Sequence, residues 1–322
     1  MNRLRIVQLL ALFLVTLGLA APAHSQDVLI RNARVHTLTT QGTLERADVL
    51  VRGGRVVEVG SNLAAPGAQV TEANGRPLTP GLFGGISGLG ISEIELESST
   101  VDRAALVDSG ASGPGFVPRP EFDVTQAFNP DSAVIGVNRA EGITFAMIAP
   151  MASGTLFAGQ GAVARLDGSD SPFVAASRTQ FLDMGPSATD GVGYSRGAQF
   201  MLLEQATREA LPGNPLQAGD VRLLTPTGRE VFARYLAGGR MAFAVDRAVE
   251  IRQVLEFATR HGVKPVIVGG AQASQVASLL ARSKVPVVIE PLLALPGTFD
   301  QLGASMENAA QLQRAGVPVM FT

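Results

Sequence analysis

The sequence predicts an α/β protein in which about eight strands alternate with helices from Leu82 onward. The last third of the chain contains continuous apolar runs of the kind found in parallel strands, at residues 241–245, 265–268, 285–289 and 317–321. Between the first two runs, Ala248, Ile251 and Leu255 recur at helical spacing. This alternation is typical of a (β/α)₈ barrel and of a doubly wound sheet, and periodicity alone does not separate the two.

Composition indicates a globular chain with one large core. Its 322 residues are 46% hydrophobic, with a formal net charge of −2 and no local basic run. A nucleic-acid partner is therefore not expected, because nothing supplies a phosphate-binding face. Cysteine is absent, so neither a disulfide nor a lipid anchor on an N-terminal cysteine can form.

The first 25 residues resemble a secretory signal peptide. Arg3 and Arg5 precede an apolar run over residues 6–20, and Ala23 and Ser25 supply small residues before a cleavage point. A membrane anchor is the alternative, but the run is shorter than the ~20 apolar residues that a span needs. The pattern predicts cleavage after Ser25 and a periplasmic or secreted bacterial protein with no membrane span after cleavage.

Short strands are expected over residues 27–72. Val28–Val35 comes first, and Asp48–Arg52 is predicted to pair with Arg55–Val59 across Gly53 and Gly54. A Gly-Gly pair between two alternating apolar runs is a strong hairpin signal, because both turn residues need a positive φ.

The middle of the chain gives weaker patterns. Strands are predicted at 143–149, 161–166 and 180–184, and helices at 194–211 and 228–237. Later helices are marked by apolar residues at helical spacing: Ala273, Val276 and Leu280, and then Met306, Ala309 and Leu312. Residues 108–131 are rich in Pro, Gly and Ser, and we expect an insertion or a loop over the barrel mouth there.

The segment Leu78–Gly90, LTPGLFGGISGLG, resembles the opening barrel strand of the amidohydrolase superfamily, particularly its secreted imidazolonepropionase-like branch. In that family a Pro-Gly-Leu-Ile-Asp segment leads into a His-x-His pair that binds the catalytic metals. Here Ile86 and Gly88 stand at the two histidine positions. Two further segments, FAGQGAVARLDG and MAFAVDRAVEI, also resemble the family, and Ala244 in the second takes a histidine position.

The resemblance implies a (β/α)₈ TIM-like barrel over residues 80–322, preceded by part of a small β-sandwich over residues 26–79. In the family, the eighth strand leads to a metal-binding Asp, and a last helix and closing strands follow. These would lie beyond Thr322, so we expect the barrel to be incomplete at its C-terminus. The implied activity is hydrolysis of carbon–nitrogen bonds in small cyclic amides or dipeptide-like compounds.

Family members use zinc or a similar divalent metal, but no metal or other cofactor is predicted for this chain. Besides Ile86, Gly88 and Ala244, the expected ligand position on the sixth strand is held by Gly269 and Gly270. None of these side chains can coordinate zinc, which requires His, Cys or carboxylate donors. The prediction is therefore a degenerate or metal-free hydrolase. The alternative is a non-catalytic periplasmic ligand-binding or scaffold protein.

Five residues near predicted strand ends are candidates for binding a small molecule in the barrel mouth. Glu290 and Asp246 are the candidate acid or base groups, and Ser87, Gln160 and Arg247 are candidate substrate contacts. Asp246 and Arg247 have the alternative role of starting the next helix, where the helix dipole favours Asp. The histidines at 36 and 261 lie outside barrel-strand ends and are interpreted as surface or cap residues. A Ser-His-Asp triad is not expected.

We expect the exported protein to begin at Gln26, because Ala23 and Ser25 provide the small side chains that the peptidase accepts. Mass spectrometry of the periplasmic and secreted fractions tests this. Replacing Ala23 with Arg (A23R) should block processing. A dominant wild-type product that still carries residues 1–25 would contradict the prediction.

Overall fold

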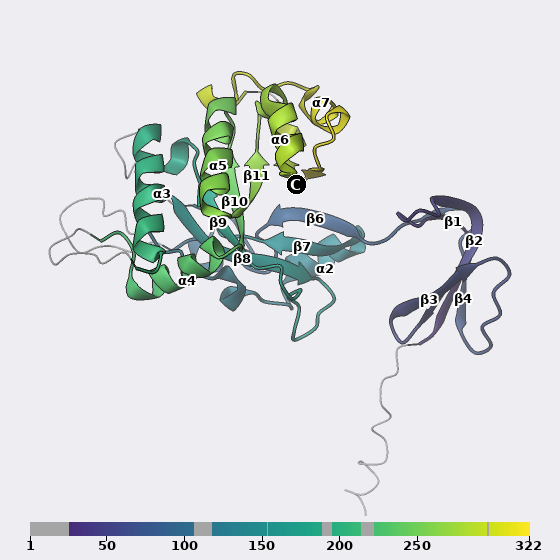
Figure 1. The fold of residues 1–322 in the computed structure, drawn as a ribbon. Helices are drawn as coiled ribbons and strands as arrows, with labels where there is room; N and C mark the ends of the chain where they lie inside the picture. Colours follow the sequence, from purple (N-terminus) through teal and green to yellow (C-terminus); the bar gives the residue numbers. More distant parts are fainter. Residues whose placement is uncertain (1–25, 106–117, 153, 189–194, 214–221, 295) are drawn as a thin grey trace, which may run out of the picture. The chain divides into compact units, whose positions relative to one another are not determined.

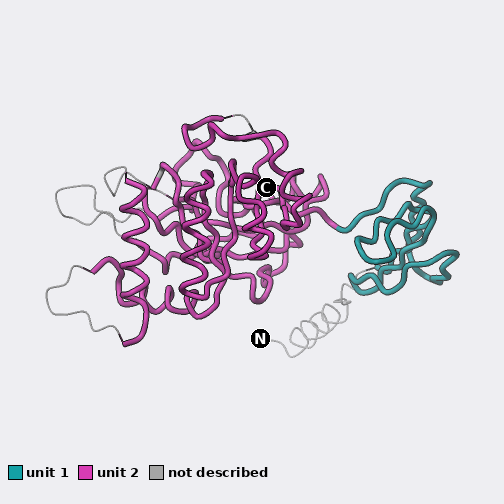
Figure 2. Tube along the Cα trace, turned by 45° about the horizontal axis from the view of Figure 1, so that its top comes forward, with its two compact units in different colours: residues 1–80 teal, residues 81–322 magenta. Residues whose placement is uncertain are grey.

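The computed structural model describes residues 26–105, 118–152, 154–188, 195–213, 222–294 and 296–322. The chain forms two compact units, Met1–Pro80 and Gly81–Thr322, which Figure 2 shows in different colours. The predicted signal peptide lies outside the described residues. Within the described ranges, no helix has the length and apolar character needed to cross a membrane.

The first unit contains one five-stranded sheet (Figure 1). Its strands are β1 (Val28–His36), β2 (Thr43–Arg52), β3 (Arg55–Gly60), β4 (Gln69–Glu72) and β5 (Pro77–Leu78). They are arranged in the order β3-β2-β1-β4, and β5 also pairs with β1. The predicted hairpin is present: Arg52 is paired with Arg55, and Gly53 and Gly54 have φ of 54° and 73°.

Small apolar clusters lie on this sheet. Val49 belongs to one cluster and Leu50, the next residue along β2, belongs to another, as expected for side chains that alternate between faces. The outer strands expose apolar side chains as well, namely Val56, Val57, Val59 and Val70. The described residues of this unit make a single sheet, so the β-sandwich inferred from the family resemblance stays a prediction.

The second unit is built on an eight-stranded sheet in the order β13-β12-β11-β10-β9-β8-β7-β6. The strands are β6 (Leu82–Ser87), β7 (Ile143–Ile148), β8 (Phe157–Arg165), β9 (Thr179–Asp183), β10 (Arg240–Val245), β11 (Lys264–Gly269), β12 (Val287–Ile289) and β13 (Val319–Phe321). The sheet forms a nearly closed barrel, which confirms the eight-stranded α/β prediction. The expectation that every strand follows a helix is wrong at β8 and at β9, because β8 runs antiparallel to both β7 and β9 and the described residues between these three strands contain no helix. Antiparallel neighbours can be joined by short loops and need no crossover helix.

Helices cover the later strands (Figure 1). They are α2 (Ala133–Ala140), α3 (Arg196–Ala210), α4 (Pro226–Leu236), α5 (Ala248–His261), α6 (Ala277–Ser283) and α7 (Asn308–Arg314). The predicted apolar face of α5 is correct, since Ala248, Ile251, Leu255 and Ala258 are all buried. These side chains join the main core cluster, which also includes Phe243 of β10 and Ile267 of β11. Met306, by contrast, precedes α7 and is exposed.

The last residue of the chain connects the two edges of the sheet. The Thr322 hydroxyl donates to the Ile86 carbonyl at 3.2 Å and accepts from the Ile86 amide at 2.6 Å. Gly85 makes the close approach possible, because a Cβ there would lie 2.5 Å from Thr322 Oγ1 and 2.7 Å from its Cα. This contact brings β6 next to β13, so the strand ends surround a common mouth.

We expect Gly85→Ala to lower the melting temperature, because Gly85 has φ of 71° and its Cβ would displace Thr322. The left-handed backbone alone costs about 1–2 kcal/mol for a non-glycine residue. Gly136→Ala is the matched control: Gly136 is exposed in α2 with no atom within 4 Å of an added Cβ. The control should be neutral or stabilising by up to about 1 kcal/mol. Equal thermal melts for the two variants would show that the barrel does not depend on this contact.

Candidate functional site

Polar side chains from four strand ends meet at the mouth of the barrel. Asp183 ends β9, Asp246 follows β10, Glu290 follows β12 and Thr322 follows β13. Together they line a cavity of about 260 Å³. An adjoining cavity of about 280 Å³ shares Asp246, Gly269 and Glu290 with it. Barrel enzymes build their active sites at this end of the strands, so we take the two adjoining cavities as the candidate site and call them the mouth cavity.

Asp246 is held in one orientation by donors from the protein. Its Oδ1 accepts from the Ala271 amide at 3.1 Å, and its Oδ2 accepts from Gln301 Nε2 at 3.1 Å. A Cβ on Gly269 would lie 2.7 Å from Oδ1. The glycine therefore leaves room for this carboxylate at the wall of the mouth cavity.

Glu290 has the opposite character. It is exposed, it lines both parts of the mouth cavity, and within the described chain no hydrogen-bond donor contacts its carboxylate. Its oxygens are thus available to accept a proton or a hydrogen bond from water or a ligand. Of the mouth-cavity carboxylates, Asp246 is thus fixed by protein donors, whereas Glu290 has no hydrogen-bond donor among the described residues.

The wall on the β12–α7 side is mainly apolar. It includes Ile289, Pro291, Met306 and Phe321. A ligand in the mouth cavity would contact carboxylates at one side and apolar side chains at the other. This arrangement suits a small compound that has N–H donors and an apolar part.

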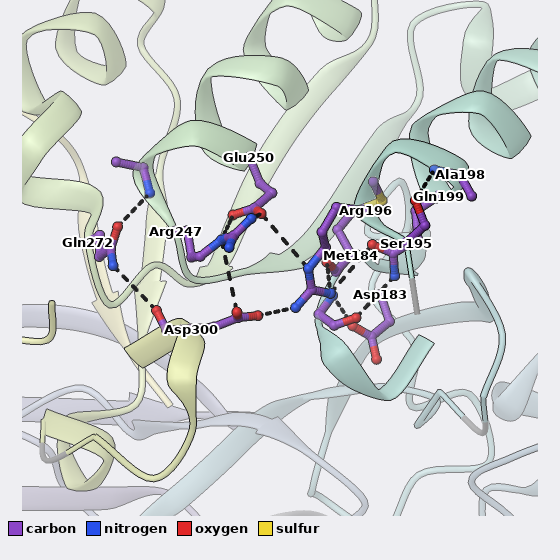
Figure 3. A network of polar contacts seen from close by, with 12 residues as sticks. Asp183, Met184, Ser195, Arg196, Ala198, Gln199, Arg247, Glu250, Gln272 and Asp300 are labelled. Carbon is purple, nitrogen blue, oxygen red and sulfur yellow. Dashed lines mark hydrogen bonds and ion pairs between the residues drawn. The ribbon is translucent and has the colours of Figure 1, made fainter. Parts of the chain in front are cut away.

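A network of two arginines and two carboxylates lies behind the mouth (Figure 3). Arg196, the first residue of α3, pairs with Asp300 and donates to the Met184 carbonyl at 3.1 Å. Arg247 donates from Nε to both Glu250 oxygens, at 2.7 and 2.8 Å. The Glu250 side chain is only 4% exposed, so its charge depends on these partners.

The network fixes Gln301, the residue that donates a hydrogen bond to Asp246. Asp300 and Gln301 are neighbours in η7 (Phe299–Gln301), and both are buried. Gln272 bridges the same region, since its Oε1 accepts from the Ala248 amide at 3.1 Å. The hydrogen bond to Glu250, with the nearby charges of Glu250 and Asp300, raises the pKa of Arg247 above its ordinary value. Arg247 therefore stays charged and anchors the start of α5.

The structure brings together only two of the five predicted site residues. Asp246 and Glu290 both line the mouth cavity. Arg247 is the N-cap residue of α5 and is engaged with Glu250, which matches its alternative role as a helix-start residue. The Ser87 hydroxyl accepts from the Leu89 amide at 2.9 Å and stabilises the turn after β6.

Gln160 lies toward the other end of the barrel. The register of β8 pairs Gln160 with Gln180, near the start of β9. The Gln160 amide donates to the Phe122 carbonyl at 2.6 Å. The expectation that residues 108–131 form a loop over the mouth is therefore wrong for the segment around Phe122. Residues 106–117 lie outside the described ranges.

The residues at the family's metal-ligand positions do not fit a zinc centre. A Cβ on Gly88 would lie 2.8 Å from Arg103 Cδ, so an arginine side chain fills the space that an imidazole would need. At Gly269 the same space is taken by Asp246. His36 contacts Thr43 in the first unit, and His261 contacts Glu204 at the end of α5. Among the described residues, no three His, Cys, Asp or Glu side chains are grouped so as to hold a metal ion.

Comparison with known proteins supports the barrel over the doubly wound sheet. The crystal structure of an amidohydrolase from Thermotoga maritima MSB8 matches with a TM-score of 0.75 and 24% identity, over 92% of this chain and 78% of that chain. The chain shares the fold of that protein. Another amidohydrolase structure matches with a TM-score of 0.47 and 18% identity, over 92% of this chain and 78% of that one.

Sequence comparison gives a shorter match. Over 66 residues the chain is 42% identical to an imidazolonepropionase of Klebsiella pneumoniae (strain 342). The match covers 19% of this chain and 16% of that protein. No protein-family model matches the chain.

The mouth-cavity residues that were not predicted from the sequence include Asp183, Gln301 and Thr322. Asp183 could have been found, because it lies in the predicted strand 180–184 and carboxylates at strand ends are site candidates in barrels. Gln301 and Thr322 give no local signal. They reach the mouth only through contacts with residues far away in the sequence.

We expect Asp300→Ala to lower the free energy of unfolding by about 2–4 kcal/mol. The substitution removes the carboxylate that pairs with both Arg196 and Arg247, so two positive charges in a largely buried network lose one of their partners. Glu307→Ala is the control. Glu307 pairs with Arg314 on the surface, where the two side chains are 62% and 72% exposed, and its loss should cost about 0.5 kcal/mol or less. Urea denaturation of both variants measures the difference. Similar midpoints would contradict a stabilising role for the network.

Proposed function

We propose that the chain is a member of the amidohydrolase superfamily, of its secreted imidazolonepropionase-like branch, and that its mouth cavity binds a small amide or dipeptide-like compound. The fold shared with the Thermotoga maritima amidohydrolase supports membership. So do the 42% identity to the Klebsiella imidazolonepropionase over 66 residues and the LTPGLFGGISGLG segment. We also propose that the protein works in the periplasm or outside the cell, from the signal-peptide pattern of residues 1–25.

The ligand class follows from the lining of the mouth cavity. Asp246 and Glu290 can accept hydrogen bonds from the N–H groups of an amide or an amine. Met306 and Phe321 provide apolar contact for the rest of the molecule. A cyclic amide or a dipeptide with an apolar side chain presents both kinds of group.

We propose hydrolysis of a carbon–nitrogen bond without a metal, with Glu290 as the general base. The Glu290 carboxylate, which has no hydrogen-bond donor within the described ranges, carries this proposal. It removes a proton from a water molecule as the water oxygen bonds to the amide carbon. The same proton passes to the leaving nitrogen as the carbon–nitrogen bond breaks, so that water is the only co-reactant. Asp246, fixed by Ala271 and Gln301, accepts a hydrogen bond from an N–H group of the substrate and so orients the substrate.

A second candidate function is ligand binding without chemistry. The backbone amides at the end of β11 favour this second function, because they already donate hydrogen bonds to other groups of the protein. Gly270 donates to the Val245 carbonyl at 2.8 Å, and Ala271 donates to Asp246. These amides are therefore not free to stabilise a developing oxyanion, which is usually a large part of catalysis in acyl transfer.

We expect protein dialysed against a chelator to hydrolyse at least one member of a panel of cyclic amides and dipeptides. Glu290→Gln should lower kcat by roughly 100-fold or more, as expected for loss of a general base, and leave the binding constant nearly unchanged. Glu256→Gln, on the exposed face of α5, is the control and should have no effect. Elemental analysis before and after zinc loading accompanies the assay.

The outcomes separate the candidates. Binding without turnover, by calorimetry on the same panel, supports the second candidate and rejects the first. Turnover that appears only after stoichiometric metal loading, and that survives Glu290→Gln, would reject both.

A further inference from the structure

A second, larger cavity lies at the amino-terminal ends of β9, β10 and β11, opposite the mouth. Its volume is about 680 Å³. Basic side chains from three elements and from the residue before β9 line it. Arg178 precedes β9, Arg234 is on α4, Arg240 begins β10, and Lys264 begins β11. We call this space the basal cavity.

The parallel register places two of these cations side by side. Arg240 and Lys264 are paired residues on neighbouring strands. Paired positions on adjacent strands lie about 5 Å apart. The two side chains therefore start from neighbouring backbone positions and carry the same charge, and an anion that binds between them would offset their repulsion.

The acids around the basal cavity do not neutralise these cations. Asp123 pairs with Arg178. Glu121 accepts from Arg119 at 3.3 Å and from the Thr225 hydroxyl at 2.7 Å. In the part of the chain that the structure describes, Arg234, Arg240 and Lys264 have neither an ion pair nor a side-chain hydrogen bond. The cavity therefore carries an excess of positive charge, and a concave wall concentrates its field.

The polar groups beside the cations are already ordered. The Tyr235 hydroxyl donates to Gln160 Oε1 at 2.9 Å, and Gln160 Nε2 donates to the Glu121 carbonyl at 3.3 Å. Burial raises the pKa of Tyr235 above its ordinary value, so its hydroxyl stays a neutral donor. Gly238 and Gly239 line the cavity without side chains and leave it open. The Tyr235–Gln160 pair therefore gives the basal cavity a fixed polar wall beside the cations.

We propose that the basal cavity binds a small organic oxyanion with two or more negative charges. Arginine side chains recognise phosphate and carboxylate groups through paired N–H donors. Here two arginines and one lysine, all without protein partners among the described residues, face one space. The volume of about 680 Å³ exceeds that of a single inorganic ion and suits a phosphate ester or a polycarboxylate. This site is separate from the mouth cavity and does not depend on the function proposed for it.

Isothermal titration of the full chain with inorganic pyrophosphate and with citrate tests the proposal. We expect saturable binding of at least one probe, and the tighter probe distinguishes a phosphate site from a carboxylate site. The double variant Arg240→Ala/Lys264→Ala should weaken binding at least tenfold. Both side chains are exposed, so the fold should survive, and circular dichroism verifies this.

The matched control removes two exposed basic residues from helices α5 and α6, in the double variant Arg252→Ala/Arg282→Ala. It should change the affinity by less than twofold. An equal loss in the control would show non-specific attraction to the basic surface and overturn the proposal. The absence of saturable binding of both probes at millimolar concentration would also overturn it.

Discussion

The pair of hydrogen bonds between Thr322 and Ile86 is the contact on which the arrangement of the site depends. It joins residues 236 positions apart and connects the two edge strands of an eight-stranded sheet. Once the sheet curves back on itself, the carboxyl ends of β9, β10 and β12 face a shared space. Asp183, Asp246 and Glu290 come together for that reason, although no segment of sequence contains more than one of them. Gly85 is needed because only a residue without a side chain permits this approach.

Features with local causes were predicted well from the sequence. The Gly53-Gly54 hairpin and helix α5 follow from turn chemistry and from apolar spacing within about fourteen residues. The direction of β8 was not predictable, because an apolar run has the same pattern read forwards or backwards. Gln160 lies in the first half of β8, is paired with Gln180 near the start of β9, and hydrogen-bonds Tyr235 beside the basal cavity.

The candidate site was predicted only in part, because the sequence does not show in which direction neighbouring side chains point. Asp246 and Arg247 are adjacent in the sequence, and strand-end rules apply equally to both, yet their side chains diverge. Asp246 is directed to Gln301 and the mouth cavity, and Arg247 to Glu250. The sequence shows that Gly88 cannot bind a metal, but it does not show that Arg103 occupies the space beside it. Such a replacement is visible only in three dimensions, and it explains why one substitution to histidine at Gly88 would not restore a ligand without moving Arg103.

The two ends of the barrel differ in charge, which the formal net charge of −2 conceals. Asp183, Asp246 and Glu290 line the mouth, and Arg234, Arg240 and Lys264 line the basal cavity. Charges at opposite ends of a barrel are farther apart than the Debye length of about 8 Å at physiological ionic strength, so they neither neutralise each other nor compete for one ligand. The mouth therefore favours donors of hydrogen bonds and the basal cavity favours oxyanions.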